Sequence, residues 1–283
     1  MTALLLQTTR WRDVTDDAAL LVTAAALDPI SVLAATTEPQ RTGRVTGLST
    51  IAASTGAVLR NLSRFSTLVV LGGRPLSSSA ADGHLLSLGG LHALTAAVAA
   101  GGRRVAFVGV GAEHISGHRD AFYARRLMKR SSFTAVDGVQ SVSHLAAAGA
   151  PWPMRTAPDL AWLALQDPPA QLSGCSEVWV PLTRLDVEAH GGASATADAL
   201  TAIAAAVEQQ KQSSTSVVVQ GWRVGTYAGE DLEAAGQVVS ALAQRGTRAR
   251  VACPPDSLAA ERDLLSRARL CVCSQVHTLM AAR

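Results

Sequence analysis

Short apolar runs alternate with alanine-rich stretches along the whole chain, and this alternation limits what the chain can fold into. Most of the runs are apolar at every position rather than at every second one. Strands of a parallel sheet have this pattern, because helices cover both faces of such a sheet. The predicted strands are 3–8, 67–72, 104–110, 132–136, 177–182, 216–221, 248–253 and 269–274.

The stretches between these strands have the composition of helices. Asp16 and Asp17 suit the first turn of one helix, and Gly101-Gly102 and Gly246 stand where helices commonly end in a left-handed residue. Alternation of strands and helices at this spacing predicts βαβ units and an open parallel sheet. The predicted helices are 16–27, 86–100, 118–130, 141–148, 195–212, 230–245 and 257–267.

A polar stretch with Pro168, Pro169 and Gly174 is the best candidate for a domain boundary. We predict an α/β fold of two Rossmann-like domains facing one another across a cleft. The N-terminal domain takes residues 1–166, a linker takes 167–176, and the C-terminal domain takes 177–283. The second domain is expected to be incomplete, because only four strands fit into it. Ligands of such sheets bind beyond the carboxyl ends of the strands.

Composition narrows the class of protein. The net charge is only +3, and the arginines are scattered and not interleaved with stacking aromatic residues, so we expect no nucleic-acid partner. The four cysteines form no C-x-x-C pair, which argues against zinc, and we expect no metal or other cofactor. No basic leader and no run of about 20 apolar residues is present, which predicts a cytoplasmic protein without a membrane span.

Two glycine pairs end predicted strands in the N-terminal half. Gly72 and Gly73 precede a long polar loop, and Gly109 and Gly111 precede His114. Glycine lets the backbone approach a ligand closely, and a basic side chain nearby can meet a phosphate or carboxylate. The alternative is a glycine-rich turn with an exposed histidine.

Further candidates lie at other junctions between a predicted strand and a helix. Asp16 opens the first helix, where backbone amides can hold an anion, or it simply caps that helix. Arg223 either binds an anion or stacks on Trp222. His277 either transfers a proton or is a capping or core histidine.

Six segments together resemble the polysaccharide pyruvyl transferase family, over nearly the whole chain. No single segment is specific, but all six follow the family's order and approximate spacing. They are "DVTDDAAL" (13–20), "LVVLGGRPL" (68–76), "VGVGAE" (108–113), "DGVQSVSHLAAAG" (137–149), "APDLAWLAL" (157–165) and "LCVCSQVHTLMAA" (270–282).

The resemblance implies a GT-B fold and transfer of a pyruvyl group from phosphoenolpyruvate to a glycan or sugar acceptor, with formation of a ketal. His277 would be the catalytic acid or base. The implied substrate-binding residues are Arg223, His114, Gly109, Gly111, Gly72, Gly73, Asp16 and Gln275.

The chain departs from the family pattern at two arginine positions. Asp137-Gly138 and Gln275 stand where the family has arginine, so two cations expected around a doubly charged donor are absent. This leaves two alternatives: a transferase that uses a nucleotide sugar on the same cleft, or a non-catalytic relative that acts as a binding protein. We also expect the short C-terminal edge to be covered, for instance by a second copy of the chain.

Overall fold

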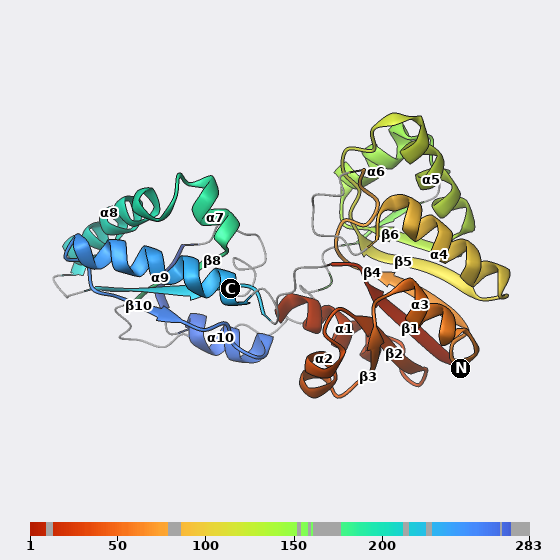
Figure 1. Cartoon of the computed structure of the whole chain (residues 1–283), viewed down its shortest axis with the longest axis horizontal. Coiled ribbons are helices and arrows are strands. Elements are labelled where there is room, and N and C mark those ends of the chain that lie inside the picture. The colour runs from red at the N-terminus through yellow and green to blue at the C-terminus, as the bar shows by residue number, and fades with distance from the viewer. Residues whose placement is uncertain are drawn as a thin grey trace. The chain divides into compact units, whose positions relative to one another are not determined.

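The protein is described by a computed structural model with two compact units, shown in Figure 1. Unit 1 holds the strands β1–β7, and unit 2 holds β8–β11. The structure describes residues 1–9, 14–78, 86–151, 154–157, 160, 177–211, 215–224, 228–266 and 268–272. The predicted linker at 167–176 therefore lies outside the described residues.

Unit 1 is built on a parallel sheet with the strand order β3-β2-β1-β4-β5-β6-β7. The chain builds outward from β1 in one direction through β2 and β3, and then in the other direction from β4 onward. This is the order of a Rossmann sheet. The strands are β1 (Thr2–Gln7), β2 (Ser31–Thr36), β3 (Ser49–Ala52), β4 (Thr67–Leu71), β5 (Arg104–Val110), β6 (Phe133–Val136) and β7 (Arg155–Thr156).

Both faces of this sheet are buried, as the apolar runs predict. Leu4, Leu68 and Phe107 pack with the helices α3 to α6, whereas Leu5 and Val69 point to the other face, where α1 packs. The helices of unit 1 are α1 (Val14–Ala26), α2 (Pro39–Thr46), α3 (Thr55–Arg60), α4 (Leu88–Ala100), α5 (Gly117–Arg130) and α6 (Val139–Ala147), with a 3₁₀ helix η1 (Leu62–Arg64).

Unit 2 repeats the arrangement on a smaller scale, with the parallel order β10-β9-β8-β11. Val178 and Val217 face α7, α8 and α9, and Trp179 and Val218 face α10. The strands are β8 (Glu177–Leu182), β9 (Ser216–Gly221), β10 (Ala249–Ala252) and β11 (Ala268–Cys271). The helices are α7 (Arg184–Ala189), α8 (Ala193–Lys211), α9 (Ala228–Gln244) and α10 (Leu258–Ser266).

The sequence patterns did not predict the helices and strands of unit 1 between residues 28 and 66. This part holds β2, α2, β3, α3 and η1. The segment is rich in Ser, Thr and Ala, and α2 contains Gly43 and starts at Pro39, so neither propensity nor apolar periodicity marks it. Pairing with the buried strand β1 decides that 31–36 is a strand. The two-residue strand β7 and the one-and-a-half-turn helix α7 were also missed, because they are too short for any periodic signal.

None of the helices in the described part of the chain combines the length and apolar character that a membrane span needs. The longest, α8, has 19 residues and carries Asp198, Glu208 and Lys211.

Removal of one aromatic ring from the core of unit 1 tests this arrangement. Phe107 is fully buried in β5, so Phe107→Ala should lower the free energy of unfolding by about 3–5 kcal/mol through lost burial and a cavity. Phe133→Ala is the matched control, because that ring is 42% exposed at the start of β6. Urea denaturation measures both. An equally large loss in the control would contradict the assignment of the core.

Candidate functional site

Each sheet has one point at which the order of its strands reverses. In unit 1 this point lies between β1 and β4, and in unit 2 between β8 and β11. Connections leave such a pair in opposite directions, which opens a crevice at the carboxyl ends of the strands. The segments after these strands start at Thr8, Gly72, Thr183 and Val272. The candidate functional residues are therefore sought at this carboxyl edge of each unit.

The glycines of unit 1 bring three loops together at its carboxyl edge. Gly72 and Gly73 have φ of +59° and +64°, a conformation that costs other residues energy, and the turn places Arg74 over Gly111. The amide of Gly111 donates to the carbonyl of Gly73 at 2.6 Å. A Cβ atom on Gly111 would lie 2.7 Å from both Arg74 Cγ and Asp137 Oδ2. Gly111 thus permits the Arg74 and Asp137 side chains to converge.

Polar contacts fix these side chains. Arg74 forms an ion pair with Glu113, and 56% of its side chain remains exposed. Ser141, in α6, donates to Asp137 Oδ1 at 2.5 Å and accepts a hydrogen bond from the amide of Ala112 at 2.9 Å. The Asp137-Gly138 position lacks the arginine that the family resemblance predicts, but the guanidinium-bearing side chain of Arg74 approaches it from another loop.

His114 and Gly109 are two further predicted site residues of unit 1. His114 is exposed, has φ of +42°, and its ring centroid lies 5.9 Å from that of His144. A non-glycine residue with positive φ is uncommon and is found in turns and functional sites. Gly109 has a packing role, because a Cβ there would lie 3.0 Å from Leu160 Cγ.

Asp16 lies at the β1–α1 junction, where its backbone carbonyl accepts a hydrogen bond from Gln7 Nε2 at 2.6 Å. The neighbouring Asp17 is buried and forms an ion pair with Arg41 at 2.6 Å, which ties α1 to α2. Gln7 Oε1 and Thr8 Oγ1 are buried, with no hydrogen-bond partner in the part of the chain that the structure describes. Buried groups of this kind are normally satisfied by ordered water or a ligand.

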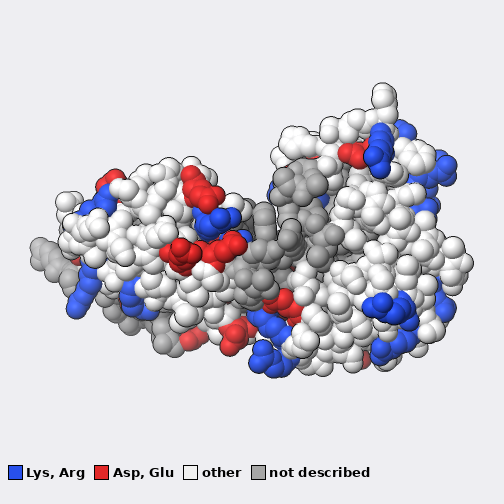
Figure 2. Space-filling view, viewed as in Figure 1, with Lys and Arg blue, Asp and Glu red and all other residues white. Residues whose placement is uncertain are grey.

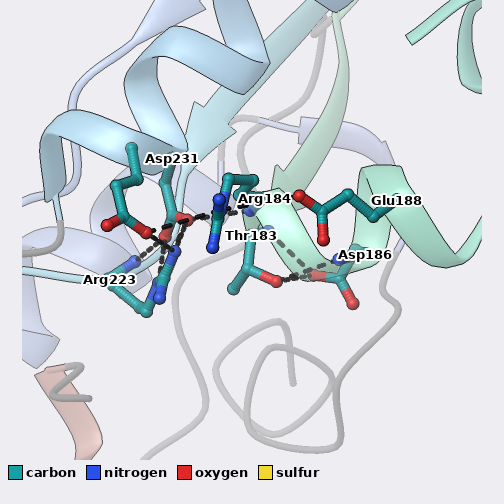
Figure 3. A network of polar contacts seen from close by, with 7 residues as sticks. Thr183, Arg184, Asp186, Glu188, Arg223 and Asp231 are labelled. Atoms are coloured by element: carbon teal, nitrogen blue, oxygen red, sulfur yellow. Dashed lines mark hydrogen bonds and ion pairs between the residues drawn. The ribbon is translucent and has the colours of Figure 1, made fainter. Parts of the chain in front are cut away.

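One carboxylate organises the carboxyl edge of unit 2 (Figure 3). Asp231, in the first turn of α9, is fully buried. It accepts hydrogen bonds from the backbone amide of Arg184 at 2.8 Å and from that of Arg223 at 2.9 Å. It also accepts from the Arg223 guanidinium, including Nε to Oδ2 at 2.9 Å. The loops after β8 and β9 are thereby fixed to the start of α9.

Arg223 is consequently engaged in a buried ion pair and is only 5% exposed. Burial by itself lowers the pKa of this guanidinium, but the hydrogen bonds that it donates to Asp231 and the charges of Asp231 and Glu230 raise the pKa overall. The sequence left two alternatives for Arg223, anion binding or stacking on Trp222 at the surface. Trp222 is buried, so it is not a surface residue on which Arg223 could stack. In this structure the charge of Arg223 is balanced from within the protein.

Arg184, which the sequence analysis did not single out, is the more exposed cation of this edge. Thr183 ends β8 and caps α7 through a reciprocal pair of hydrogen bonds with Asp186, and Arg184 is the first residue of that helix. Its side chain is 51% exposed, and Nε lies 3.5 Å from Glu230 and 3.6 Å from Glu188 (Figure 3). The Thr-x-x-Asp capping box after a buried strand was the signal that could have located it.

The remaining predicted site residues, Gln275 and His277, lie outside the described residues, so their roles stay predictions. No group of three or more His, Cys, Asp or Glu side chains within the described ranges is arranged to hold a metal ion. A largely apolar hollow of about 410 Å³ in unit 1 is lined by Thr2, Thr67, Arg104 and Phe133 among others. These residues lie at the amino ends of the strands, opposite to the candidate site.

Comparisons with known proteins show the fold. No protein-family model matches the chain, and no curated protein matches it in sequence. In structure it is similar to a putative UDP-N-acetylglucosamine 2-epimerase from Listeria monocytogenes, with a TM-score of 0.59 and 9% identity over 99% of this chain and 76% of that chain. The UDP-GlcNAc 2-epimerase from Neisseria meningitidis bound to UDP-GlcNAc gives a TM-score of 0.55 and 10% identity over 96% and 76% of the two chains.

Anabaena HepE in complex with UDP is also similar, with a TM-score of 0.52 and 10% identity over 99% of this chain and 79% of that chain. These similarities extend over nearly the whole chain and confirm an α/β fold of two Rossmann-like domains of the GT-B type. They give no separate support to the resemblance to pyruvyl transferases, which stays a prediction.

A methyl group at Gly111 tests the convergence of loops in unit 1. We expect Gly111→Ala to lower the free energy of unfolding by about 1–3 kcal/mol, because the added Cβ displaces Arg74 and Asp137. Gly138→Ala is the control, since a Cβ there meets nothing within 4 Å. Urea unfolding would show the difference, and equal stability of the two variants would contradict the close approach.

The buried carboxylate of unit 2 allows a second test. Asp231→Ala leaves Arg223 buried without its partner and should cost about 3–5 kcal/mol of stability. Asp198→Ala removes the exposed partner of another Asp–Arg pair and should have a much smaller effect. The double variant Arg223→Met/Asp231→Leu should recover the part of the loss that the unpaired guanidinium causes, but not the part that comes from the amides of Arg184 and Arg223, which lose their acceptor. If the single variant at Asp231 unfolds at the wild-type urea concentration, the pair does not hold this edge.

Proposed function

We propose that the protein is a group transferase of the GT-B type that uses a nucleoside-diphosphate sugar, with a sugar as acceptor. The observation that carries the proposal is the carboxyl edge of unit 2. Arg184 presents a half-exposed guanidinium there, and in the described part of the chain no side chain takes a hydrogen bond from it. A guanidinium binds phosphate oxygens through paired hydrogen bonds, as a diphosphate requires.

The carboxylate beside Arg184 suits the rest of such a donor. Glu230 is about half exposed and lies 3.5 Å from Arg184 Nε. A carboxylate next to a diphosphate site can accept hydrogen bonds from ribose hydroxyls, as in other Rossmann-type sheets. Arg223 and Asp231 act as positioning residues in this proposal, because they fix the backbone of both loops that carry the donor contacts.

The similar structures support this choice of donor. Two of them are described as bound to UDP-GlcNAc or in complex with UDP. The diphosphate of a nucleotide sugar carries less negative charge than phosphoenolpyruvate, in which both the carboxylate and the phosphate monoester are ionised, so it needs fewer protein cations. The absence of arginine at Asp137-Gly138 and at Gln275 therefore favours the nucleotide sugar.

The acceptor is assigned to the carboxyl edge of unit 1. Ser141 holds Asp137 Oδ1, which leaves Oδ2 over Gly111 to accept a hydrogen bond from a sugar hydroxyl. Transfer to that hydroxyl requires removal of its proton, and a carboxylate in hydrogen-bond reach can take it. Asp137 is thus a proposed base in unit 1, in addition to His277, which the family resemblance implies as acid or base.

Pyruvyl transfer from phosphoenolpyruvate is the second candidate. The observation that favours it is Arg74, whose side chain converges with Asp137 and partly replaces the arginine absent from that segment. The two candidates differ in their donor, so ligand binding separates them. Thermal shift and titration calorimetry with UDP, UDP-GlcNAc and phosphoenolpyruvate are the decisive measurements.

Arg184→Gln should weaken the binding of UDP roughly tenfold or more, because a charge-assisted contact to the diphosphate is lost. Arg250→Gln is the matched control: its side chain is 52% exposed in the same unit and pairs with Glu177 at the start of β8, away from the carboxyl edge. Binding of phosphoenolpyruvate alone would favour the second candidate. Binding of none of the three ligands by a folded sample would overturn both.

A further inference from the structure

The positive charge of the protein is concentrated in one segment of unit 1. Residues 84–136 contain only two acidic residues, Glu113 and Asp120, although the whole chain carries only a small excess of 25 basic over 22 acidic residues. The rest of the chain therefore sums to a small negative charge. The basic residues of the segment are Arg103, Arg104, Arg119, Arg125, Arg126, Lys129 and Arg130.

Most of these residues lie on α5, and four positions form a single stripe. Arg119, Phe122, Arg126 and Lys129 recur at spacings of three, four and three, which places them along one side of a helix. All four are exposed. The buried residues of α5, Ala124, Leu127 and Met128, face the opposite side. These four positions are called the α5 stripe. Phe122 is 42% exposed and lies between the charged positions of the α5 stripe.

The other two arginines of α5 are bound to neighbouring elements. Arg125 Nη1 donates to the carbonyl of Ala148 at 3.2 Å, and Arg130 Nη1 donates to Thr95 Oγ1 at 3.1 Å. Their charges add to the positive potential of this surface, but their side chains hold α5 against the neighbouring elements. Figure 2 shows Lys and Arg side chains along the edge of unit 1 where α5 lies.

Little on the adjoining elements balances this charge. Asp120 is the one acidic residue of α5, and the sequences of α4 and α6 contain none. Burial lowers the pKa of Arg130, and so does the charge of Arg126. The pKa of His92, on α4, is likewise lowered by burial and then by Arg130 and Arg126. Arg126 and Arg130 thus act on each other, and Asp120 is the carboxylate of α5 whose charge acts on Arg119.

We propose that the α5 stripe is a docking surface for a membrane that contains anionic phospholipids. A helix of 14 residues presents a straight face about 21 Å long, and such a convex face fits a flat layer of headgroups. Arg119, Arg126 and Lys129 bind lipid phosphates, and Phe122 enters the interface between headgroups. Basic residues close to such a surface gain affinity from its negative potential.

The two aromatic rings of α5, Phe122 and Tyr123, argue against a nucleic acid as the occupant. Single strands are held by bases that stack on free aromatic faces in a basic groove. The guanidinium of Arg126 lies over the Phe122 ring, 5.3 Å from its centroid, and Arg119 lies 5.5 Å from the centroid of Tyr123. Those ring faces are occupied by guanidinium groups that a lipid phosphate can still reach. The stripe therefore suits a headgroup layer better than a strand of bases.

Co-sedimentation with vesicles tests the proposal. The protein should bind vesicles of phosphatidylcholine mixed with phosphatidylglycerol, fail to bind phosphatidylcholine alone, and lose binding as salt is raised. Arg126→Gln/Lys129→Gln should lower the partition coefficient on the order of 25-fold, because each basic residue contributes roughly fivefold. Phe122→Ser should lower it with the charge unchanged. All three side chains are exposed, so thermal melting should show folded variants.

Arg60→Gln/Arg64→Gln is the matched control, since it removes the same charge from exposed positions of α3 and η1 in the same unit. An equal loss in this control would show a net-charge effect and overturn the docking surface. No binding to the mixed vesicles would overturn it as well. The proposal would also be overturned if the protein binds a single-stranded RNA oligonucleotide in a salt-dependent way but binds no vesicles, and if Arg126→Gln/Lys129→Gln abolishes that RNA binding. The assay contains no nucleotide, so its outcome is independent of the proposed donor.

Discussion

Burial of both faces of two parallel sheets is the constraint on which the rest of the structure depends. Strands such as β1 and β9 have nearly every side chain covered, so the sheet faces leave no room for unbalanced charge. Several buried polar groups near the carboxyl ends of strands are paired, namely Asp17 with Arg41, Asp231 with Arg223, and Gln220 with Glu261 at 2.7 Å, whereas Gln7 Oε1 and Thr8 Oγ1 have no hydrogen-bond partner among the described residues. We therefore expect chemistry at one edge of each unit, where loops rather than strands supply the side chains.

The two units fix these loops by different means. In unit 1 the absence of a side chain at Gly111 lets Arg74 and Asp137 converge, whereas in unit 2 the buried carboxylate of Asp231 binds two loop backbones at once. Both solutions leave one arginine about half exposed: Arg74 in unit 1 and Arg184 in unit 2. Each is held near a carboxylate but not enclosed by it. The proposed function depends on the second of these two arginines.

Sequence patterns gave a correct account of the fold wherever burial was continuous along the chain. The strands β4, β5, β8 and β9 were located to within a residue, because a run such as "TLVVL" is apolar at every position. β2 and β3 were missed, because their Ser, Ala and Thr residues acquire a strand conformation only by pairing, β2 with β1 and β3 with β2. For the site, the sequence indicated Gly72, Gly73 and Gly111 but not Arg74 or Arg184. A basic residue in a loop looks the same in sequence whether a carboxylate buries it or solvent surrounds it.

The sequence by itself determined the α/β class and the two Rossmann-like units, because apolar periodicity is local and directly records which faces are buried. The tertiary structure alone decided which charges are neutralised. Arg223 finds Asp231 eight residues away, and the same carboxylate holds the backbone of Arg184 at a separation of 47 residues. It also decided that the side of α5 with Arg119, Phe122, Arg126 and Lys129 is exposed. Coulomb energy and hydrogen bonding depend on distance in space, and no local pattern in the sequence specifies that distance.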